Sequence, residues 1–147
     1  MKISNTELLR YSKQIILKKI GISGQKKISS AKVLIVGVGG LGCPLSLYLT
    51  NTGIKNIGIV DNDKVDVSNL NRQILFNTTD VGKYKVIQAR KFLKKINKKV
   101  KINIYKYRLT KKNIKNIINK YDIICDCSDN FTTRYLLNSF CFKSKKI

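Results

Sequence analysis

The sequence predicts an α/β domain with an open, mostly parallel sheet, helices on both faces and a helical segment ahead of it. Two observations predict this fold. Short apolar runs alternate with helix-like segments along the chain, and a glycine-rich turn joins the first run to the segment that follows. A length of 147 residues suits one compact core. We therefore expect an N-terminal helical segment, 1–30, and one sheet domain, 31–147.

The N-terminal segment begins with a helix start signal. Ser4 and Glu7 have the spacing of a capping box, which predicts a helix through "LLRYSKQIIL", residues 8–17. "GISGQ", residues 21–25, is predicted to be a glycine-punctuated link before the sheet.

The first βαβ unit is the clearest part of the pattern. "KVLIVG", residues 32–37, is an apolar run, as expected for a strand covered on both faces. "GVGGLG" then predicts a turn into a helix that ends at Gly53, and "NIGIVD", residues 56–61, predicts the second strand.

The remaining segments continue the alternation. In the next predicted helix, Val86, Ala89 and Leu93 share one face and lysines occupy another. Residues 143–147, "KSKKI", are expected to approach a further strand. A sheet of only four strands would leave an edge uncovered. The predicted elements are helices at 81–97, 110–121 and 130–142, a half-wet strand at 99–107 and a buried strand at 122–128.

A formal charge of +22, from 30 lysines and arginines against 8 carboxylates, raises the question of nucleic-acid binding. The lysines are scattered through every segment, together with many Asn and Ile, and arginines are few. That pattern indicates a general compositional drift. Nucleic-acid binding is therefore not expected.

Compartment and metal content follow from what the sequence contains. No signal peptide and no run of about 20 apolar residues is present, so we expect a soluble, cytoplasmic protein and no membrane partner. The four cysteines form no C-x-x-C pair and the chain has no histidine. Zinc is therefore not expected, and buried reduced thiols are the favoured interpretation.

The glycine turn predicts a phosphate site. Gly37, Gly39, Gly40 and Gly42 match G-x-G-x-x-G between a strand and a helix. Glycines permit a tight turn and close backbone approach, so that free amides at the helix start face phosphate oxygens. The alternative is a turn that serves only close helix-strand packing.

Asp61 closes the second predicted strand, 24 residues after Gly37, where an acidic side chain accepts hydrogen bonds from a ribose. The nearby Asp63 and Asp66 are interpreted as turn residues. To this point, NAD and ATP fit the pattern equally well.

The polar loop separates the two nucleotides. Arg72 supplies a planar guanidinium and Lys85 a compact ammonium, which suit a triphosphate whose α-phosphorus must become electrophilic. Nicotinamide chemistry needs neither. Asn69 and Asn71 orient phosphate oxygens or cap the next turn, and capping is favoured for Asn71.

The fourth predicted strand ends in "DCSDN", residues 126–130. Carboxylates at the C-terminal end of a parallel strand face the ligand crevice, so Asp129 is a candidate ligand of Mg²⁺ bound to phosphates. An N-cap role for Asp129 is the alternative, and both roles are compatible.

Five ordered motifs together resemble the ThiF/MoeB family, bacterial relatives of the ubiquitin-activating enzymes with a Rossmann-like ATP-binding domain. They are "RYSKQIIL", "GVGGLG", "DNDKVDVSNLNRQILF", "VGKYK" and "DCSDN". The resemblance implies ATP-dependent adenylation, with Mg²⁺, of the C-terminal glycine of a ubiquitin-like sulfur-carrier protein. We also expect a homodimer formed through the N-terminal helix and the exposed sheet edge. The sulfur then serves thiamine or molybdopterin synthesis.

The resemblance also implies residue roles. Gly40 would lie beside the phosphates, Asp61 would bind ribose and Asp129 would coordinate magnesium; Ser68, Asn69, Arg72 and Lys85 would contact the triphosphate. Lys13 stands where the family has an arginine that reaches the partner subunit's phosphates, and lysine lacks the bidentate fork.

Family members also continue further than this chain, so we expect the usual C-terminal part to be missing. Two alternatives stay open: a truncated, non-catalytic nucleotide-binding partner and an NAD-dependent oxidoreductase.

Overall fold

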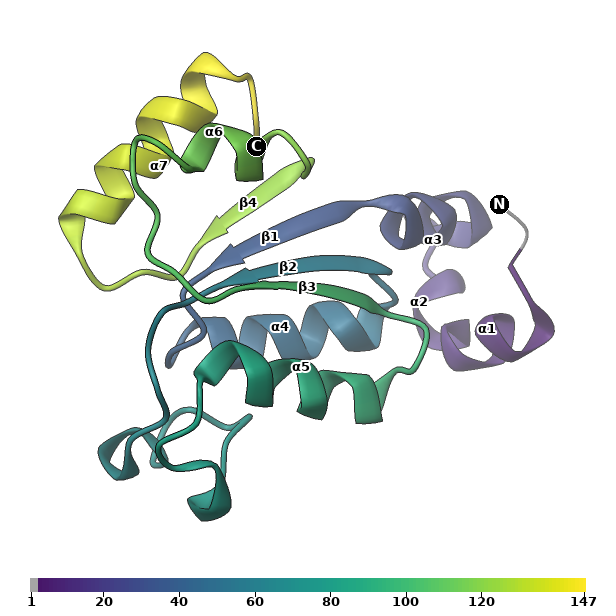
Figure 1. Cartoon of the computed structure of the whole chain (residues 1–147). Coiled ribbons are helices and arrows are strands. Elements are labelled where there is room, and N and C mark those ends of the chain that lie inside the picture. The colour runs from purple at the N-terminus through teal and green to yellow at the C-terminus, as the bar shows by residue number, and fades with distance from the viewer. Residues whose placement is uncertain (1–2) are drawn as a thin grey trace.

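In the computed structural model, which describes residues 3–147, four parallel strands form one sheet in the order β3-β2-β1-β4 (Figure 1). The predicted open parallel sheet is confirmed. The strands are β1 (Lys32–Val36), β2 (Asn56–Val60), β3 (Lys101–Tyr105) and β4 (Ile123–Asp126). Because β1 lies at the centre, the chain crosses to one side of it for β2 and β3 and to the other side for β4.

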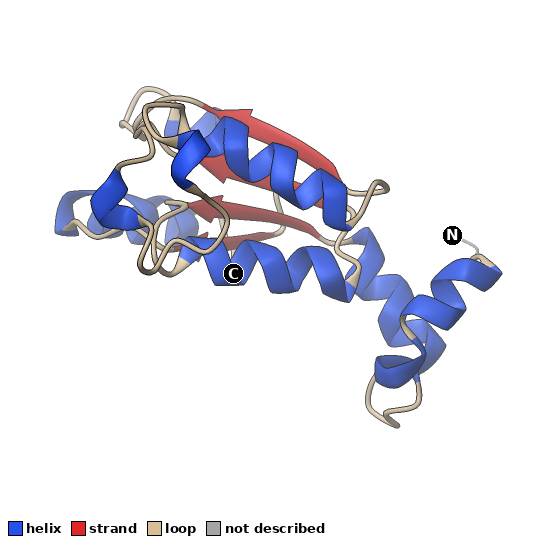
Figure 2. Cartoon of the chain, turned by 90° about the horizontal axis from the view of Figure 1, so that it is seen from below, coloured by secondary structure: helices blue, strands red, loops and turns tan. Residues whose placement is uncertain are grey.

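Helices cover both faces of the sheet, as predicted (Figures 1 and 2). On one face, Val33 and Ile35 of β1 pack in a core with residues of α4 and α5; on the other, Leu34 and Val36 pack with residues of α6 and α7. The uninterrupted apolar run of β1 is therefore explained by burial on both faces. The helices are α4 (Gly42–Thr52), α5 (Lys85–Ile96), α6 (Ile114–Ile118) and α7 (Phe131–Lys143).

The ends of α4 and α5 show how local sequence sets these elements. Gly53 ends α4 in the left-handed conformation, with φ of 99°, as its position predicted. Helix α5 starts at Lys85 rather than near residue 81. The loop between β2 and α5 contains two short 3₁₀ turns, Val67–Asn69 and Thr78–Asp80.

The N-terminal segment forms three helices, α1 (Asn5–Arg10), α2 (Ser12–Ile15) and α3 (Gly21–Ser30). The capping box is confirmed, since the Ser4 hydroxyl accepts from the Glu7 amide and the Glu7 carboxylate accepts from the Ser4 amide. The prediction of one long helix over residues 8–17 was wrong, because the chain turns at Tyr11, whose side chain is buried.

The link predicted at "GISGQ" was also wrong, because these residues open helix α3. Gln25 explains the difference. Its side chain is fully buried and donates to the Thr52 carbonyl oxygen at 3.0 Å, so packing against the end of α4 outweighs the low helix propensity of Gly21 and Gly24.

Strand β4 is an edge strand and only half-buried, so the prediction of a buried strand at 122–128 was wrong in its burial. No further strand follows within residues 3–147. The Ile147 carbonyl oxygen nevertheless accepts a hydrogen bond from the Ile124 amide at 2.7 Å, so the segment 143–147 does reach the edge of β4.

Cys43 is buried, and Cys125, Cys127 and Cys141 are half-buried; all four are free thiols. Burial raises the pKa of the Cys43 and Cys127 thiols to about 11. Among the described residues, no helix is long and apolar enough to cross a membrane.

Candidate functional site

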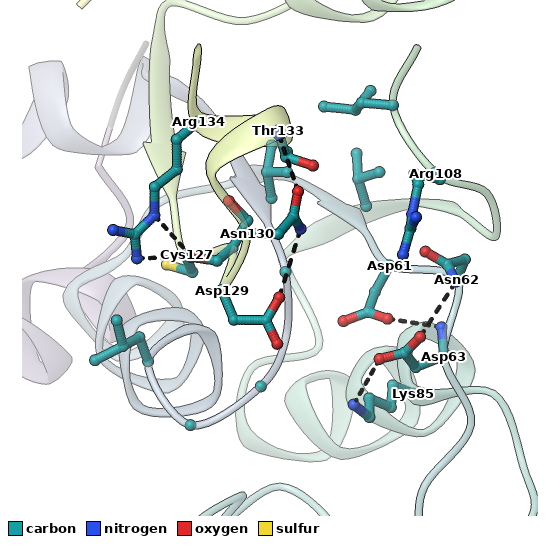
Figure 3. Close-up of a pocket in the computed structure, with 18 of the residues that line it drawn as sticks. Asp61, Asn62, Asp63, Lys85, Arg108, Cys127, Asp129, Asn130, Thr133 and Arg134 are labelled. Atoms are coloured by element: carbon teal, nitrogen blue, oxygen red, sulfur yellow. Dashed lines mark hydrogen bonds and ion pairs between the residues drawn. The ribbon is translucent and has the colours of Figure 1, made fainter. Parts of the chain in front are cut away.

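A cleft of about 550 Å³ opens at the carboxyl ends of the four strands. This is the edge where open parallel sheets bind ligands, next to the point where the strand order reverses between β1 and β4. Its walls come from the glycine turn after β1, the loop after β2, the start of α5 and the segments that follow β3 and β4. Figure 3 shows the side chains that converge there.

The glycine turn divides into a packing part and an open part. Gly37 has φ of 89°, and a Cβ on Gly42 would stand 2.0 Å from the Gly37 carbonyl oxygen, so these two positions are required by close backbone packing. Gly39 and Gly40 line the cleft, where a Cβ would meet only side chains, at 3.7 and 3.6 Å. Gly42 does not line the cleft, so the packing alternative holds for Gly42.

Asp61 is fixed at the end of β2 beside the glycine turn. Its Oδ2 accepts from the Val38 amide at 2.9 Å and its Oδ1 from the Asp63 amide at 2.8 Å. Burial raises the pKa of this carboxyl group, while the two amides act in the opposite direction. Each oxygen retains a second lone pair, so Asp61 can accept hydrogen bonds from a ligand in the cleft.

Lys85, the first residue of α5, is buried at the floor of the cleft. Its Nζ lies 3.2 Å from Asp63 Oδ2, and the Asp63 side chain is 57% exposed. Figure 3 shows this pair below Asp61. Asp63 is therefore more than a turn residue, because it neutralises a buried cation that faces the ligand site.

Arg72 lies over the glycine turn, with its Cγ and Cδ 3.6 Å from the position of a Cβ on Gly40. Its Nη1 donates to the Ser68 carbonyl oxygen at 3.1 Å and to Asn71 Oδ1 at 3.0 Å. The loop therefore holds the guanidinium at the wall of the cleft.

Ser68 and Asn69 do not line the cleft. The Ser68 hydroxyl donates to Asp66 Oδ1 at 2.6 Å, and Asn69 Nδ2 donates to the Ser68 hydroxyl at 3.3 Å. In the free protein these side chains stabilise the loop that carries Arg72. The cap of the 3₁₀ turn Val67–Asn69 is Asp66, whose side chain accepts from the Ser68 amide, so the capping alternative for Asn69 was wrong.

Asp129 lies across the cleft from Asp61, Asp63 and Lys85 (Figure 3). Its side chain is exposed, and Asn130 Nδ2 is 3.5 Å from its Oδ1. The N-cap of α7 is Asn130, whose side chain accepts from the Thr133 amide at 2.9 Å. The capping alternative for Asp129 was therefore wrong, and the carboxylate is free to face a ligand.

Two further arginines line the cleft, and the sequence analysis did not select them. Arg108 follows β3 and points toward Asp61 and Asn62 in Figure 3. Arg134, in the first turns of α7, donates to the Ser128 carbonyl oxygen from Nε at 3.2 Å and from Nη2 at 2.9 Å. The rule that ligands bind at the carboxyl ends of all the parallel strands points to both positions.

Lys13 is not brought to the cleft of its own chain. It is exposed on α2, in the N-terminal segment that packs beyond the opposite end of the sheet (Figure 1). The cleft itself combines backbone amides with four cationic side chains and three carboxylates; the cations are Arg72, Lys85, Arg108 and Arg134. Such a site can bind a polyanion with a sugar attached and neutralise charge that develops on it.

Comparison with known proteins agrees with this geometry. The model described as "ThiF family" matches residues 11–147. The chain is 48% identical to an adenylyltransferase and sulfurtransferase MOCS3 of Culex quinquefasciatus, over 99% of this chain and 33% of that protein. It is 45% identical to a sulfur carrier protein adenylyltransferase of Thermus thermophilus, over 94% of this chain and 51% of that protein.

Solved structures share the fold. The E. coli tRNA N6-threonylcarbamoyladenosine dehydratase TcdA, in complex with ATP, has a TM-score of 0.92 and 26% identity, over 99% of this chain and 60% of that one. E. coli MccB has a TM-score of 0.84 and 28% identity, over 99% and 43%. The chain thus spans about a third to a half of the length of the curated relatives named above.

Proposed function

Because the chain belongs to the ThiF family, we propose that it catalyses the ATP-dependent adenylation of a carboxylate. The acceptor would be the C-terminal glycine carboxylate of a ubiquitin-like sulfur-carrier protein. One observation carries the proposal: Asp61, Arg72, Lys85 and Asp129 line the same cleft as the open part of the glycine turn. The name of the Thermus relative supports the choice of carrier.

In the proposed reaction, a carboxylate oxygen attacks the α-phosphorus in line. The new O–P bond gives an acyl-adenylate, and the bond to the β-phosphate breaks, so that pyrophosphate leaves with the electron pair. Both reactants are anionic, so charge neutralisation and positioning are the main tasks of the site. Arg72 and Lys85 would neutralise the triphosphate, Asp61 would bind the ribose, and the amides near Gly39 and Gly40 would face phosphate oxygens.

The residues of the cleft fit Mg²⁺ as a companion of ATP. Within residues 3–147, no cluster of three or more His, Cys, Asp or Glu side chains could hold a metal ion by itself. Magnesium in nucleotide sites typically takes one or two carboxylates together with phosphate oxygens and water. The exposed Asp129 would supply such a carboxylate. Bound there, the ion would lower the negative charge of the phosphates.

We also propose a homodimer formed through the N-terminal segment. Its helices carry exposed apolar side chains, notably Leu9 at 79%, Ile16 at 72% and Leu17 at 54%. Lys13 is exposed on the same segment, so it could reach the cleft of a second copy although it does not line its own. Sedimentation of the protein should give twice the monomer mass, and a monomer at all concentrations would contradict this part.

ATP–pyrophosphate exchange with a supplied sulfur-carrier protein tests the activity. We expect exchange that depends on the carrier's C-terminal glycine and on Mg²⁺. Binding of MgATP without exchange would instead identify a non-catalytic nucleotide-binding partner. Tighter binding of NAD than of MgATP would favour an oxidoreductase.

A further inference from the structure

One continuous segment of the chain is rich in basic residues and lacks acidic ones. Residues 81–121 carry 15 of the 30 lysines and arginines and none of the eight carboxylates. This segment includes α5 and β3, which form one outer side of the molecule, with β3 as the outermost strand of the sheet (Figure 1). Nine of these 15 lie in residues 81–105, which lead into and contain α5 and β3, so this edge of the fold carries many cations and no carboxylate of its own.

A groove of about 550 Å³ lies between α5 and β3 at this edge. It shares no lining residue with the nucleotide cleft. Its polar lining consists of Arg90, Lys91, Lys94, Lys99, Lys101 and Asn103. The two remaining lining residues are buried aliphatic side chains, so the groove offers cations and one amide but no exposed apolar side chain.

Most of the cations that line the groove form no ion pair with a carboxylate. Within residues 3–147, Lys99 is the one member of the groove with an ion pair, to Glu7 at 3.7 Å. Arg90, Lys91, Lys94 and Lys101 are exposed and face solvent without an acidic partner. Unpaired like charges repel one another, so an anionic ligand that spans them would relieve that repulsion.

We propose that this groove binds the sugar-phosphate backbone of a nucleic acid. A protein partner of high affinity normally needs a buried apolar or aromatic anchor, which the groove does not provide. Phosphates need only positive side chains and hydrogen-bond donors, and such contacts are independent of base sequence. This inference does not depend on the proposed adenylation, because the two sites are separate.

The test compares two variants of the full chain that lose the same charge. The groove variant carries Arg90→Gln, Lys91→Gln, Lys94→Gln and Lys101→Gln. Its matched control carries glutamine at four exposed lysines of the N-terminal segment, Lys18, Lys19, Lys26 and Lys27. Fluorescence anisotropy would measure binding of labelled RNA and DNA hairpins of one sequence between 50 and 200 mM KCl. Far-UV circular dichroism melting checks that both variants fold.

For the wild-type protein, we expect the logarithm of affinity to fall with the logarithm of salt concentration with a slope of about −3 or steeper, since each phosphate contact contributes about −0.7 to −0.9. The groove variant should bind at least about tenfold more weakly and have a slope shallower by about 3, while the control keeps most of its affinity. The double variant Lys91→Gln/Lys94→Gln removes two of the four cations, so its slope should differ from that of the wild-type protein by about half as much as the slope of the groove variant does. Comparing the affinities for the RNA and the DNA hairpin then shows which of the two nucleic acids the groove prefers.

Three results would overturn the proposal. Equal losses in the groove variant and the control would mean that binding follows net charge alone. A wild-type slope near zero would exclude phosphate contacts. Tighter binding of polyglutamate than of either hairpin would assign the groove to an acidic protein. ATP binding, followed in parallel, reports on the separate cleft, so failure of one proposal leaves the other measurable.

Discussion

Lys85 and Asp63 form an ion pair at the floor of the cleft at the carboxyl ends of the strands, with 3.2 Å between Lys85 Nζ and Asp63 Oδ2. The lysine is buried and the aspartate is half-exposed, so the pair holds a cation inside the cleft before any phosphate arrives. A triphosphate entering the cleft would compete with Asp63 for the ammonium and would be repelled by the carboxylate. On the proposed function, we therefore expect Asp63 to oppose the binding of ATP that lacks magnesium.

We predict that Asp63→Asn binds magnesium-free ATP about 3- to 10-fold more tightly than the wild-type protein, because removing one negative charge near the phosphates gives on the order of 1 kcal/mol. Isothermal titration calorimetry measures the change. Asp80→Asn is the matched control, since Asp80 lies on the same loop between β2 and α5 but does not line the cleft. Unchanged or weaker binding in Asp63→Asn would show that the carboxylate does not oppose the phosphates.

We predict that Arg72→Ala lowers ATP–pyrophosphate exchange by about 10²- to 10³-fold, the typical cost of removing one donor that stabilises developing charge. The guanidinium lies over Gly40 at the cleft wall, so its loss removes charge from the phosphate region. Arg72→Lys should recover part of the rate, because the charge is kept and the fork is lost. Arg90→Ala, outside the cleft, controls for net charge; exchange equal in Arg72→Ala and Arg90→Ala would refute the role.

Two glycines of the turn should respond differently to the same substitution. Gly42→Ala places a Cβ 2.0 Å from the Gly37 carbonyl oxygen, so we predict a loss of about 2–4 kcal/mol in the free energy of unfolding. Gly40→Ala meets only the Arg72 side chain at 3.6 Å and should cost less than about 1 kcal/mol, yet weaken ATP binding about tenfold by blocking close phosphate approach. Urea unfolding and calorimetry measure the two effects. Equal stability of both variants would contradict the division of the turn.

Features set by a local sequence pattern could be predicted from the sequence, and features that depend on the assembled fold could not. The turn at Gly37 and the position of Asp61 follow from a local strand-turn-helix pattern, so they could be predicted. Arg108 and Arg134 enter the cleft from segments with no ordered motif of their own, and only the assembled sheet brings them there. Sequence alone shows neither distance nor which lysines share a surface. For that reason it missed the basic groove.

Helix α3 and the loop residues Ser68 and Asn69 show the same limit. Local propensity favoured a link at Gly21 and Gly24. These residues instead form the start of α3, because the buried Gln25 side chain donates a hydrogen bond to the end of α4. The motif that suggested phosphate contacts for Ser68 and Asn69 could not separate a residue in the cleft from one that supports it. In the free protein, hydrogen bonds within the loop occupy both side chains.

The last prediction concerns pH and the joint between the N-terminal segment and the sheet domain. Glu7 on α1 lies 2.7 Å from Lys55 Nζ, which precedes β2, and 3.7 Å from Lys99 Nζ, which precedes β3. Lys55 first, and then hydrogen bonds from Ser4, lower the pKa of Glu7 from 4.5 to about 2. The carboxylate thus links the two parts of the chain.

Because the pKa of Glu7 is lower in the folded than in the unfolded protein, its carboxylate stabilises the fold, and this effect is complete at pH values above the unfolded pKa of about 4.5. The stabilisation is lost as the pH falls through about 4.5 toward the folded pKa of about 2. Because water still reaches both lysines, we expect a contribution of about 1 kcal/mol rather than the full value of the shift. Urea unfolding at pH 6 should find Glu7→Gln less stable than the wild-type protein by that amount. The gap should narrow steadily as pH falls from about 4.5 toward about 2, where about half of the wild-type carboxylate is protonated. A gap that stays constant from pH 6 to pH 2 would show that the charge of Glu7 does not hold the N-terminal segment on the sheet domain.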